Sequence, residues 1–184
     1  MGLMRPGKEE QMKKLFALIL ALGLLCSLAW AEDAPPELNW NDLDTEKLLA
    51  NGGFQFISIQ DPELTLIYWI PSNLAPADVS AIAPEIRPIA AFATEDSKYS
   101  VSVFALRVNS LEEYINAQGV ADTANLMMVN GLQVISAEKP DDDQDVAIVP
   151  VDSTTVITFA FTPLNEDGWD EVKASIVASI QLPQ

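Results

Sequence analysis

The stretch from residue 154 to residue 180, TTVITFAFTPLNEDGWDEVKASIVASI, decides the fold of this chain. Its first half alternates between two kinds of side chain, which is typical of a β-strand. We predict a strand over 155–161 that Pro163 ends, because proline has no N–H to donate. One face of this strand carries Thr155, Ile157, Phe159 and Phe161. The other carries Val156, Thr158, Ala160 and Thr162, which are small and only mildly polar, so we expect both faces to be covered.

The second half of the stretch predicts a closing helix. Its large apolar residues recur at steps of three, four and four, which form one helical stripe: Trp169, Val172, Ile176 and Ile180. Asn165 or Asp167 is placed to cap the helix, and Asp170 and Glu171 put negative charge at its positive end. We expect Trp169 to belong to the core rather than to a ligand site, because an indole buries a large apolar area.

The N-terminus predicts export. Residues 12–31, MKKLFALILALGLLCSLAWA, join two lysines to an apolar run and end in an A-x-A cleavage site. We expect a leader over 1–31 that starts at Met12 and is cleaved after Ala31. The alternative is a retained membrane anchor, for which the apolar run is short. Leu24 and Leu25 precede Cys26, where a lipoprotein signal needs a small residue, so we expect no lipid anchor.

Composition excludes several kinds of chemistry. Cys26 leaves with the predicted leader, and the chain contains no histidine, so thiol catalysis, disulfides and the commonest general base are absent from the mature protein. The net charge of −17 disfavours contact with nucleic acids or anionic lipids. The sequence therefore predicts an acidic protein of the extracellular or cell-envelope space.

The remaining patterns predict a linker over 32–40 and one domain over 41–184. Apolar alternation indicates a hairpin over 54–60 and 64–70, strands over 99–108 and 146–151, and a hairpin over 126–129 and 132–135, whose Asn130-Gly131 turn is of type I′. We expect helices over 41–50, after Pro76, and over 110–117, where Ser110 and Glu113 form a capping box. Runs of adjacent strands indicate an antiparallel sheet flanked by helices, an α+β fold.

The chain resembles the PsbP-like family of proteins. The similar segments are the hairpin ending at 66–71 (LIYWIP), the middle hairpin at 128–132 (MVNGL), and the close of the last helix at 176–180 (IVASI). The resemblance implies an α/β/α sandwich and a role in binding or assembly without catalysis. It implies no catalytic residue, because the family has no catalytic motif to carry over. The segment 71–88, rich in proline, departs from the family pattern.

An acidic loop is the first candidate site. Asp141, Asp143 and Asp145 stand at alternate positions, and Asp152 stands where an EF-hand loop has its twelfth residue. Val146 replaces the glycine that the sharp turn of an EF-hand needs, and the flanks predict strands rather than helices. A calcium site of another kind and a solvated loop both remain open, and solvation is the usual role of such a run.

Two further groups of residues are candidate sites. Hydrolysis by paired acids would draw on Glu112, Glu113, Asp170 and Glu171, but neighbouring positions face different sides of a helix. Stacking of a carbohydrate would draw on Trp40, Tyr68, Trp69 or Trp169. The chain has no nucleophile elbow, P-loop or dinucleotide fingerprint.

We therefore expect a secreted, non-catalytic binding protein with no cofactor and no metal or catalytic residue, whose partner is another extracellular or envelope protein. The alternative is a protein that binds calcium or a small ligand, and an acid-based hydrolase comes last.

Overall fold

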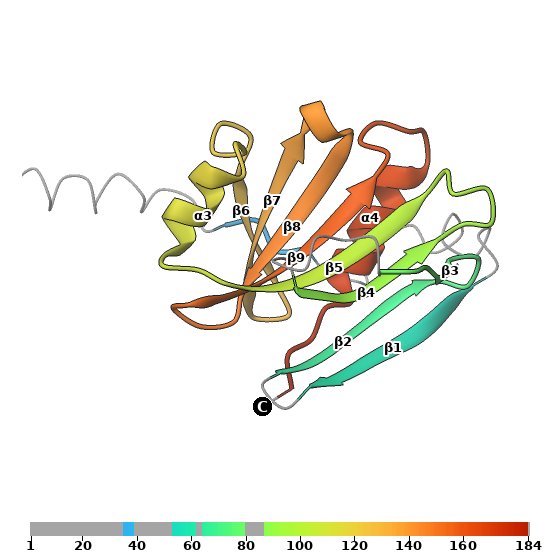
Figure 1. The fold of residues 1–184 in the computed structure, drawn as a ribbon, viewed down its shortest axis with the longest axis horizontal. Helices are drawn as coiled ribbons and strands as arrows, with labels where there is room; N and C mark the ends of the chain where they lie inside the picture. The colour runs from blue at the N-terminus through green and yellow to red at the C-terminus, as the bar shows by residue number, and fades with distance from the viewer. Residues whose placement is uncertain (1–34, 39–52, 62–63, 80–86, 184) are drawn as a thin grey trace, which may run out of the picture. The chain divides into compact units, whose positions relative to one another are not determined.

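The computed structural model describes residues 35–38, 53–61, 64–79 and 87–183 (Figure 1). The predicted leader over 1–31, most of the linker, the helix over 41–50 and residue Trp40 lie outside these ranges. The elements in chain order are β1 Phe54–Asp61, β2 Leu64–Pro71, β3 Ala75–Pro76, β4 Arg87–Ala93, β5 Ser100–Arg107, α3 Leu111–Ala117, β6 Asn125–Val129, β7 Leu132–Lys139, the 3₁₀ turn η2 Pro140–Asp142, β8 Gln144–Pro150, β9 Thr155–Thr162 and α4 Trp169–Ala178.

The chain has the predicted α+β fold, built on a seven-stranded antiparallel sheet. The strand order is β3-β4-β5-β9-β8-β7-β6. The predicted strand over 155–161 is thus β9, which lies between β5 and β8 near the middle of the sheet. It ends at Thr162, directly before Pro163, as predicted.

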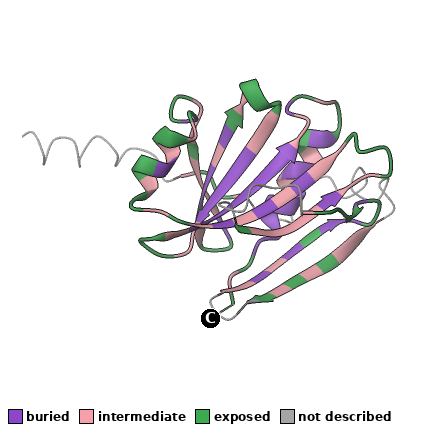
Figure 2. Cartoon of the chain, viewed as in Figure 1, coloured by how far each residue is buried: buried purple, intermediate pink, exposed green. Residues whose placement is uncertain are grey.

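Both faces of β9 are covered, which confirms the expectation from its two apolar sides. Ile157, Phe159 and Phe161 belong to the larger core cluster with α4 and β2. Val156 and Ala160 belong to a second cluster on the opposite face, where α3 supplies Tyr114 and neighbouring side chains. Figure 2 shows the central strands as largely buried. Helices therefore flank both faces of the sheet.

The first hairpin forms a sheet of its own rather than joining the larger one. β1 pairs only with β2 in a two-stranded sheet, and β2 lies between β1 and the rest of the domain in Figure 1. The inner face of the hairpin packs on the seven-stranded sheet through Tyr68, whose ring meets Phe159 edge-on at 5.1 Å and Phe92 at 6.4 Å. Period two indicates which side chains face inward, but not which sheet a strand joins.

Two predicted local signals have the expected geometry. Asn130 and Gly131 both have positive φ, 50° and 78°, as a type I′ turn requires. The Ser110 side chain accepts a hydrogen bond from the Glu113 backbone N–H at 3.1 Å and so caps α3. Only this half of the predicted capping box forms, because the Glu113 carboxylate accepts from the Asn109 side chain at 3.1 Å. Gly119, with φ of 70°, follows the end of this helix.

Two predictions of local structure are wrong, and one strand was not predicted. Neither Asn165 nor Asp167 caps α4, because Gly168 occupies the N-cap with φ of 77° and no side chain caps the helix. Pro76 does not begin a helix, because it lies in β3 opposite Phe92. Strand β4 was not predicted, because Pro88 interrupts its pattern. This proline is tolerated because it lies beside a register shift, on the part of β4 with which β3 does not pair.

Among the described residues, no helix is long and apolar enough to cross a membrane.

Candidate functional site

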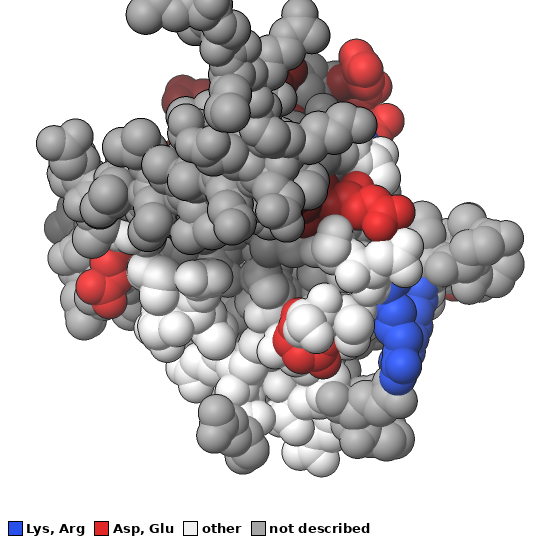
Figure 3. Space-filling model, turned by 90° about the vertical axis from the view of Figure 1, so that its left-hand side faces the viewer, with Lys and Arg blue, Asp and Glu red and all other residues white. Residues whose placement is uncertain are grey.

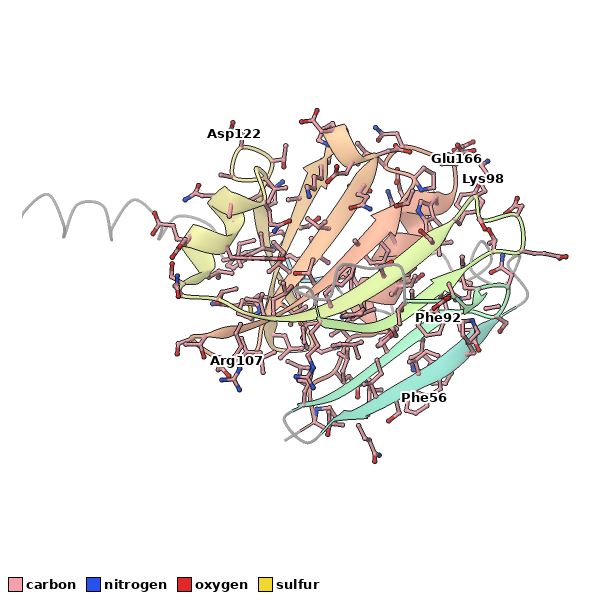
Figure 4. The ribbon with its side chains drawn as sticks, in the orientation of Figure 1. Phe56, Phe92, Lys98, Arg107, Asp122 and Glu166 are labelled. Carbon is pink, nitrogen blue, oxygen red and sulfur yellow. The ribbon has the colours of Figure 1, made fainter. Side chains whose placement is uncertain are left out.

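The outer face of the β1–β2 hairpin carries the most exposed large apolar side chains in the described part of the chain. Phe56 lies directly opposite Trp69, and their rings meet edge-on at 5.2 Å. Phe56 is 51% exposed and Trp69 is 38% exposed. Figure 4 shows Phe56 on β1, on the side of the hairpin away from Phe92. Exposed aromatic pairs of this kind are enriched where proteins bind partners.

The edge of β1 that faces away from β2 adds a second feature to this surface. Ile67 of β2 exchanges two backbone hydrogen bonds with Gln181, at 3.0 and 2.9 Å, and the Trp69 N–H donates to the Ser179 hydroxyl at 2.9 Å. These two β2 residues therefore direct their N–H groups away from β1. Their partners across the hairpin, Ser58 and Phe56, stand at the same non-hydrogen-bonded positions and point their own N–H and C=O groups outward.

Along residues 54–60, the edge of β1 has no bulge, charge or proline, three features that often protect an edge strand. Its register with β2 runs without a bulge from Phe54 to Asp61, and residues 54–60, FQFISIQ, contain no charge and no proline. By contrast, β4 begins with Arg87 and Pro88 and has a bulge. Strand β6 is partly covered, because Glu37 forms a parallel bridge with Met128. Among the described strands, β1 thus presents a long, regular and uncharged edge.

The hairpin is held in place by its inner face and by the end of the chain. Leu66, Tyr68 and Ile70 are fully buried. The Tyr68 hydroxyl has no hydrogen-bond partner among the described residues, and burial raises the pKa of this tyrosine above its ordinary value. The 179–181 segment pairs with the opposite edge of β2. A partner that binds the outer face would therefore meet a hairpin that the rest of the domain already holds in place.

The structure separates the four acids of the proposed calcium loop. Asp152 follows the C-terminal end of β8, whereas the other three acids lie near its start. The Asp152 carboxylate accepts hydrogen bonds from the Thr154 N–H at 2.7 Å and from the Thr154 hydroxyl at 3.0 Å. The backbone hydrogen bond is the main reason that the pKa of Asp152 is lowered. An EF-hand-like arrangement in which Asp152 closes the loop is therefore wrong. Within the described ranges, no group of three acidic, histidine or cysteine side chains is placed to hold a metal ion.

The acids near the start of β8 have protein partners. Asp143 accepts a hydrogen bond from the Leu164 N–H at 3.2 Å, and Asp142 pairs with Lys139 at 2.6 Å. Asp145 forms an ion pair with Lys173 of α4. Burial is the largest influence on the pKa of Asp145, which is raised despite this ion pair.

Lys173 is a buried structural cation. Only 7% of the residue is exposed, and its ammonium group reaches the Asp145 carboxylate, the Asp170 carboxylate at 2.6 Å and the Leu164 carbonyl at 2.6 Å. Three partners use the three N–H donors of an ammonium group. Lys173 therefore fastens α4 to β8 and to the loop before the helix, and sequence reasoning did not identify it.

The predicted acid pairs do not converge. Glu112 and Glu113 belong to α3, while Asp170 and Glu171 belong to α4, and these helices pack on opposite faces of the sheet. Figure 3 shows acidic side chains at separate places on one face of the molecule. The four residues thus form no common site.

The predicted aromatic platforms divide into buried and exposed residues. Tyr68 is fully buried and Trp169 is 5% exposed, so Trp169 belongs to the core as expected. Trp69 alone among the described candidates is exposed, and its neighbour Phe56 was not identified from the sequence. The hairpin register gives a signal that would have found Phe56. Counting back from the Asp61–Leu64 pair at the turn places Phe56 directly opposite Trp69.

Two hollows lie beside the strands of the larger sheet. A groove of about 310 Å³ lies between α4 and the sheet, and apolar side chains line much of it, among them Leu38, Met127, Ala147, Phe161 and Val177. A smaller hollow of about 220 Å³ lies where β4 and β5 approach the start of β2, with Arg87 and Arg107 among its lining residues.

No family model and no curated protein sequence matches this chain. Among solved structures, the chain is similar to the solution structure of cyanobacterial PsbP from Synechocystis. The two share 15% sequence identity with a TM-score of 0.48, and the match covers 71% of this chain and 92% of the other.

Proposed function

We propose that this chain is an exported, non-catalytic binding protein that contacts another extracellular or envelope protein through the outer face of its β1–β2 hairpin. The Phe56–Trp69 pair carries the proposal, because it exposes two aromatic rings on an uncharged, rigidly held surface. Aromatic anchors supply much of the binding energy at protein interfaces. The predicted signal peptide supports the location, and the lack of histidine in the whole chain supports a role without acid–base catalysis.

A photo-crosslinking experiment in intact cells tests this proposal. A photoreactive phenylalanine analogue replaces Phe56 in one variant and Asn116, an exposed residue of α3, in the control. We expect the Phe56 variant to crosslink to one protein that the Asn116 variant does not reach. The purified partner should then bind the full chain, and Trp69→Ala should weaken this binding by about tenfold or more, as loss of an aromatic anchor does. Equal crosslinking at both positions would contradict the proposal.

A second candidate function is the binding of a small, mainly apolar ligand in the groove beside α4. The groove volume of about 310 Å³ falls within the lower range of known ligand sites. Isotope-labelled methionine methyl groups provide the test, because Met127 lines the groove. A ligand in the groove should shift the Met127 methyl signal, and a Met127→Leu variant identifies that signal. A ligand that binds without shifting it would exclude this groove.

A further inference from the structure

We propose that two copies of this chain pair through their β1 strands about a two-fold axis, with Ser58 of one copy opposite Ser58 of the other. The two hairpins would then form one four-stranded sheet in the order β2-β1-β1-β2. The inference deepens the proposed function, because it makes the joined outer faces of two hairpins the surface that a partner contacts.

The outward backbone groups of β1 carry the inference. Ser58 and Phe56 point N–H and C=O groups away from β2, and the alternation extends to Gln60. Antiparallel pairing of two β1 strands around Ser58 brings Phe56 opposite Gln60 of the second copy. Each of these pairs can exchange hydrogen bonds in both directions, so the two edges satisfy each other.

The side chains of β1 are compatible with this register. Ile57 stands opposite Ile59 of the second copy, at a non-hydrogen-bonded position where side chains approach most closely. Asp61 stands opposite Gln55 of the second copy and not opposite another acid. No like charges therefore face each other along the paired strands.

The charge of the molecule favours this edge over other surfaces. A net charge of −17 makes most contacts between two copies repulsive, but residues 54–60 carry no charge. An edge strand without charge, proline or bulge is the kind that pairs with another chain. The second copy thus meets its partner where repulsion is lowest.

The other edge of the hairpin explains why pairing stops at two copies. Gln181 and Ser179 occupy the far edge of β2, so this edge is not available to a third chain. A two-fold axis perpendicular to the sheet also keeps both outer faces on one side. The dimer therefore presents two Phe56–Trp69 pairs on a single surface.

Sedimentation velocity of the full chain over a range of concentrations tests the inference. We expect a reversible monomer–dimer equilibrium. Ser58→Pro removes an outward N–H and leaves the ladder to β2 intact, which an edge strand tolerates. At the two-fold axis this change removes a donor from each copy, so the dissociation constant of the dimer should rise at least about tenfold. Ser58→Thr is the control and should dimerise like the unchanged chain.

A second variant covers the case in which proline disturbs the hairpin. Ser58→Lys keeps the N–H but places two positive charges opposite each other, and it should also weaken the dimer. A single monomeric species at every concentration up to about 1 mM, which corresponds to no useful affinity, would overturn the inference. A dimer that both variants leave unchanged would overturn it as well.

The proposed function is tested separately from the dimer. Ser58→Pro tests the dimer and leaves Phe56 and Trp69 in place, whereas Trp69→Ala removes an aromatic anchor and leaves the β1 edge in place. Loss of partner binding in Trp69→Ala with an intact dimer supports the binding face alone. An unchanged chain that stays monomeric and still binds the partner contradicts the dimer and keeps the proposed function.

Discussion

The two β-hairpins of this chain have similar local structure but different surroundings. The β6–β7 hairpin belongs to the seven-stranded sheet and forms one end of it, and its Asn130 side chain donates to the Ala178 and Ile180 carbonyls at 2.9 and 3.0 Å. The β1–β2 hairpin forms a separate sheet in which no described strand pairs with the outer edge of β1, and its aromatic pair is exposed. The difference indicates that the β6–β7 hairpin serves stability, while the β1–β2 hairpin is available for contact with a partner.

The largest expected effect comes from the two tryptophans, one on each side of this comparison. Trp169→Ala should lower the free energy of unfolding by about 3–5 kcal/mol, because the side chain is buried against Tyr99 and the core. Trp69→Ala should lower it by less than about 1.5 kcal/mol, since part of the ring already faces solvent. Urea denaturation of both variants measures the difference. Similar losses in the two variants would mean that the hairpin face is structural.

The next effect concerns Lys173. Lys173→Met should lower the free energy of unfolding by about 2–3 kcal/mol, because it leaves the partly buried Asp145 carboxylate without its cation. The double variant Lys173→Met with Asp145→Asn should recover much of this loss, because the only charge then left without Lys173 is that of Asp170, whose side chain is largely exposed. Chemical denaturation of the three chains provides the test. A double variant as unstable as the single one would show that the ion pair is not the cause.

A smaller effect is expected at the β6–β7 turn. Asn130→Gly keeps the positive φ that the turn needs but removes two hydrogen bonds to the end of α4. We expect a loss of about 1–2 kcal/mol. Thermal denaturation followed by circular dichroism measures it. Gly131→Asn keeps both bonds, so any loss in that variant reports only the strain of a side chain at positive φ. An unchanged melting temperature in Asn130→Gly would show that these bonds do not hold the helix.

The smallest effect should be a gain in stability on the inner face of the first hairpin. Tyr68→Phe removes a buried hydroxyl that has no partner among the described residues, so the free energy of unfolding should rise by about 1 kcal/mol. A fall in stability would reveal a hydrogen bond to this hydroxyl.

The pH dependence of the same variant follows from the direction of its pKa shift. Burial raises the pKa of Tyr68, so the unfolded chain loses the proton first and the unchanged protein should lose stability as the pH rises above about 10. Tyr68→Phe should lose less over this range. Some loss remains in the variant, because burial also raises the pKa of Tyr114. Urea midpoints at pH 8 and pH 11 measure the two slopes, and equal slopes would contradict the assignment.

Local signals in the sequence predicted local structure well. The Asn130-Gly131 turn, the Ser110 cap and the two covered faces of β9 follow from residues that are neighbours in the chain. The same reasoning placed Trp169 in the core, because a helical stripe is a local pattern as well. These features needed no knowledge of distant contacts.

The remaining features depend on contacts between distant residues. Pairing of Ile67 with Gln181 closes one edge of the hairpin, and nothing near either residue indicates it. The Lys173–Asp145 ion pair joins two residues that are 28 positions apart in the sequence. Strand β4 was missed because Pro88 normally interrupts a strand, and only its place beside a bulge explains it. The candidate surface was therefore found only in part, through Trp69.

Hydrogen exchange of the β1 amides tests the central claim most directly. In a dilute sample, the outward amides of Phe56, Ser58 and Gln60 should exchange rapidly, while the inward amides of Ile57 and Ile59 remain protected by β2. In a concentrated sample, or with a bound partner that covers the edge, the outward amides should become protected as well. Equal protection of both sets in the dilute sample would contradict the account, because the edge of β1 would then already be closed.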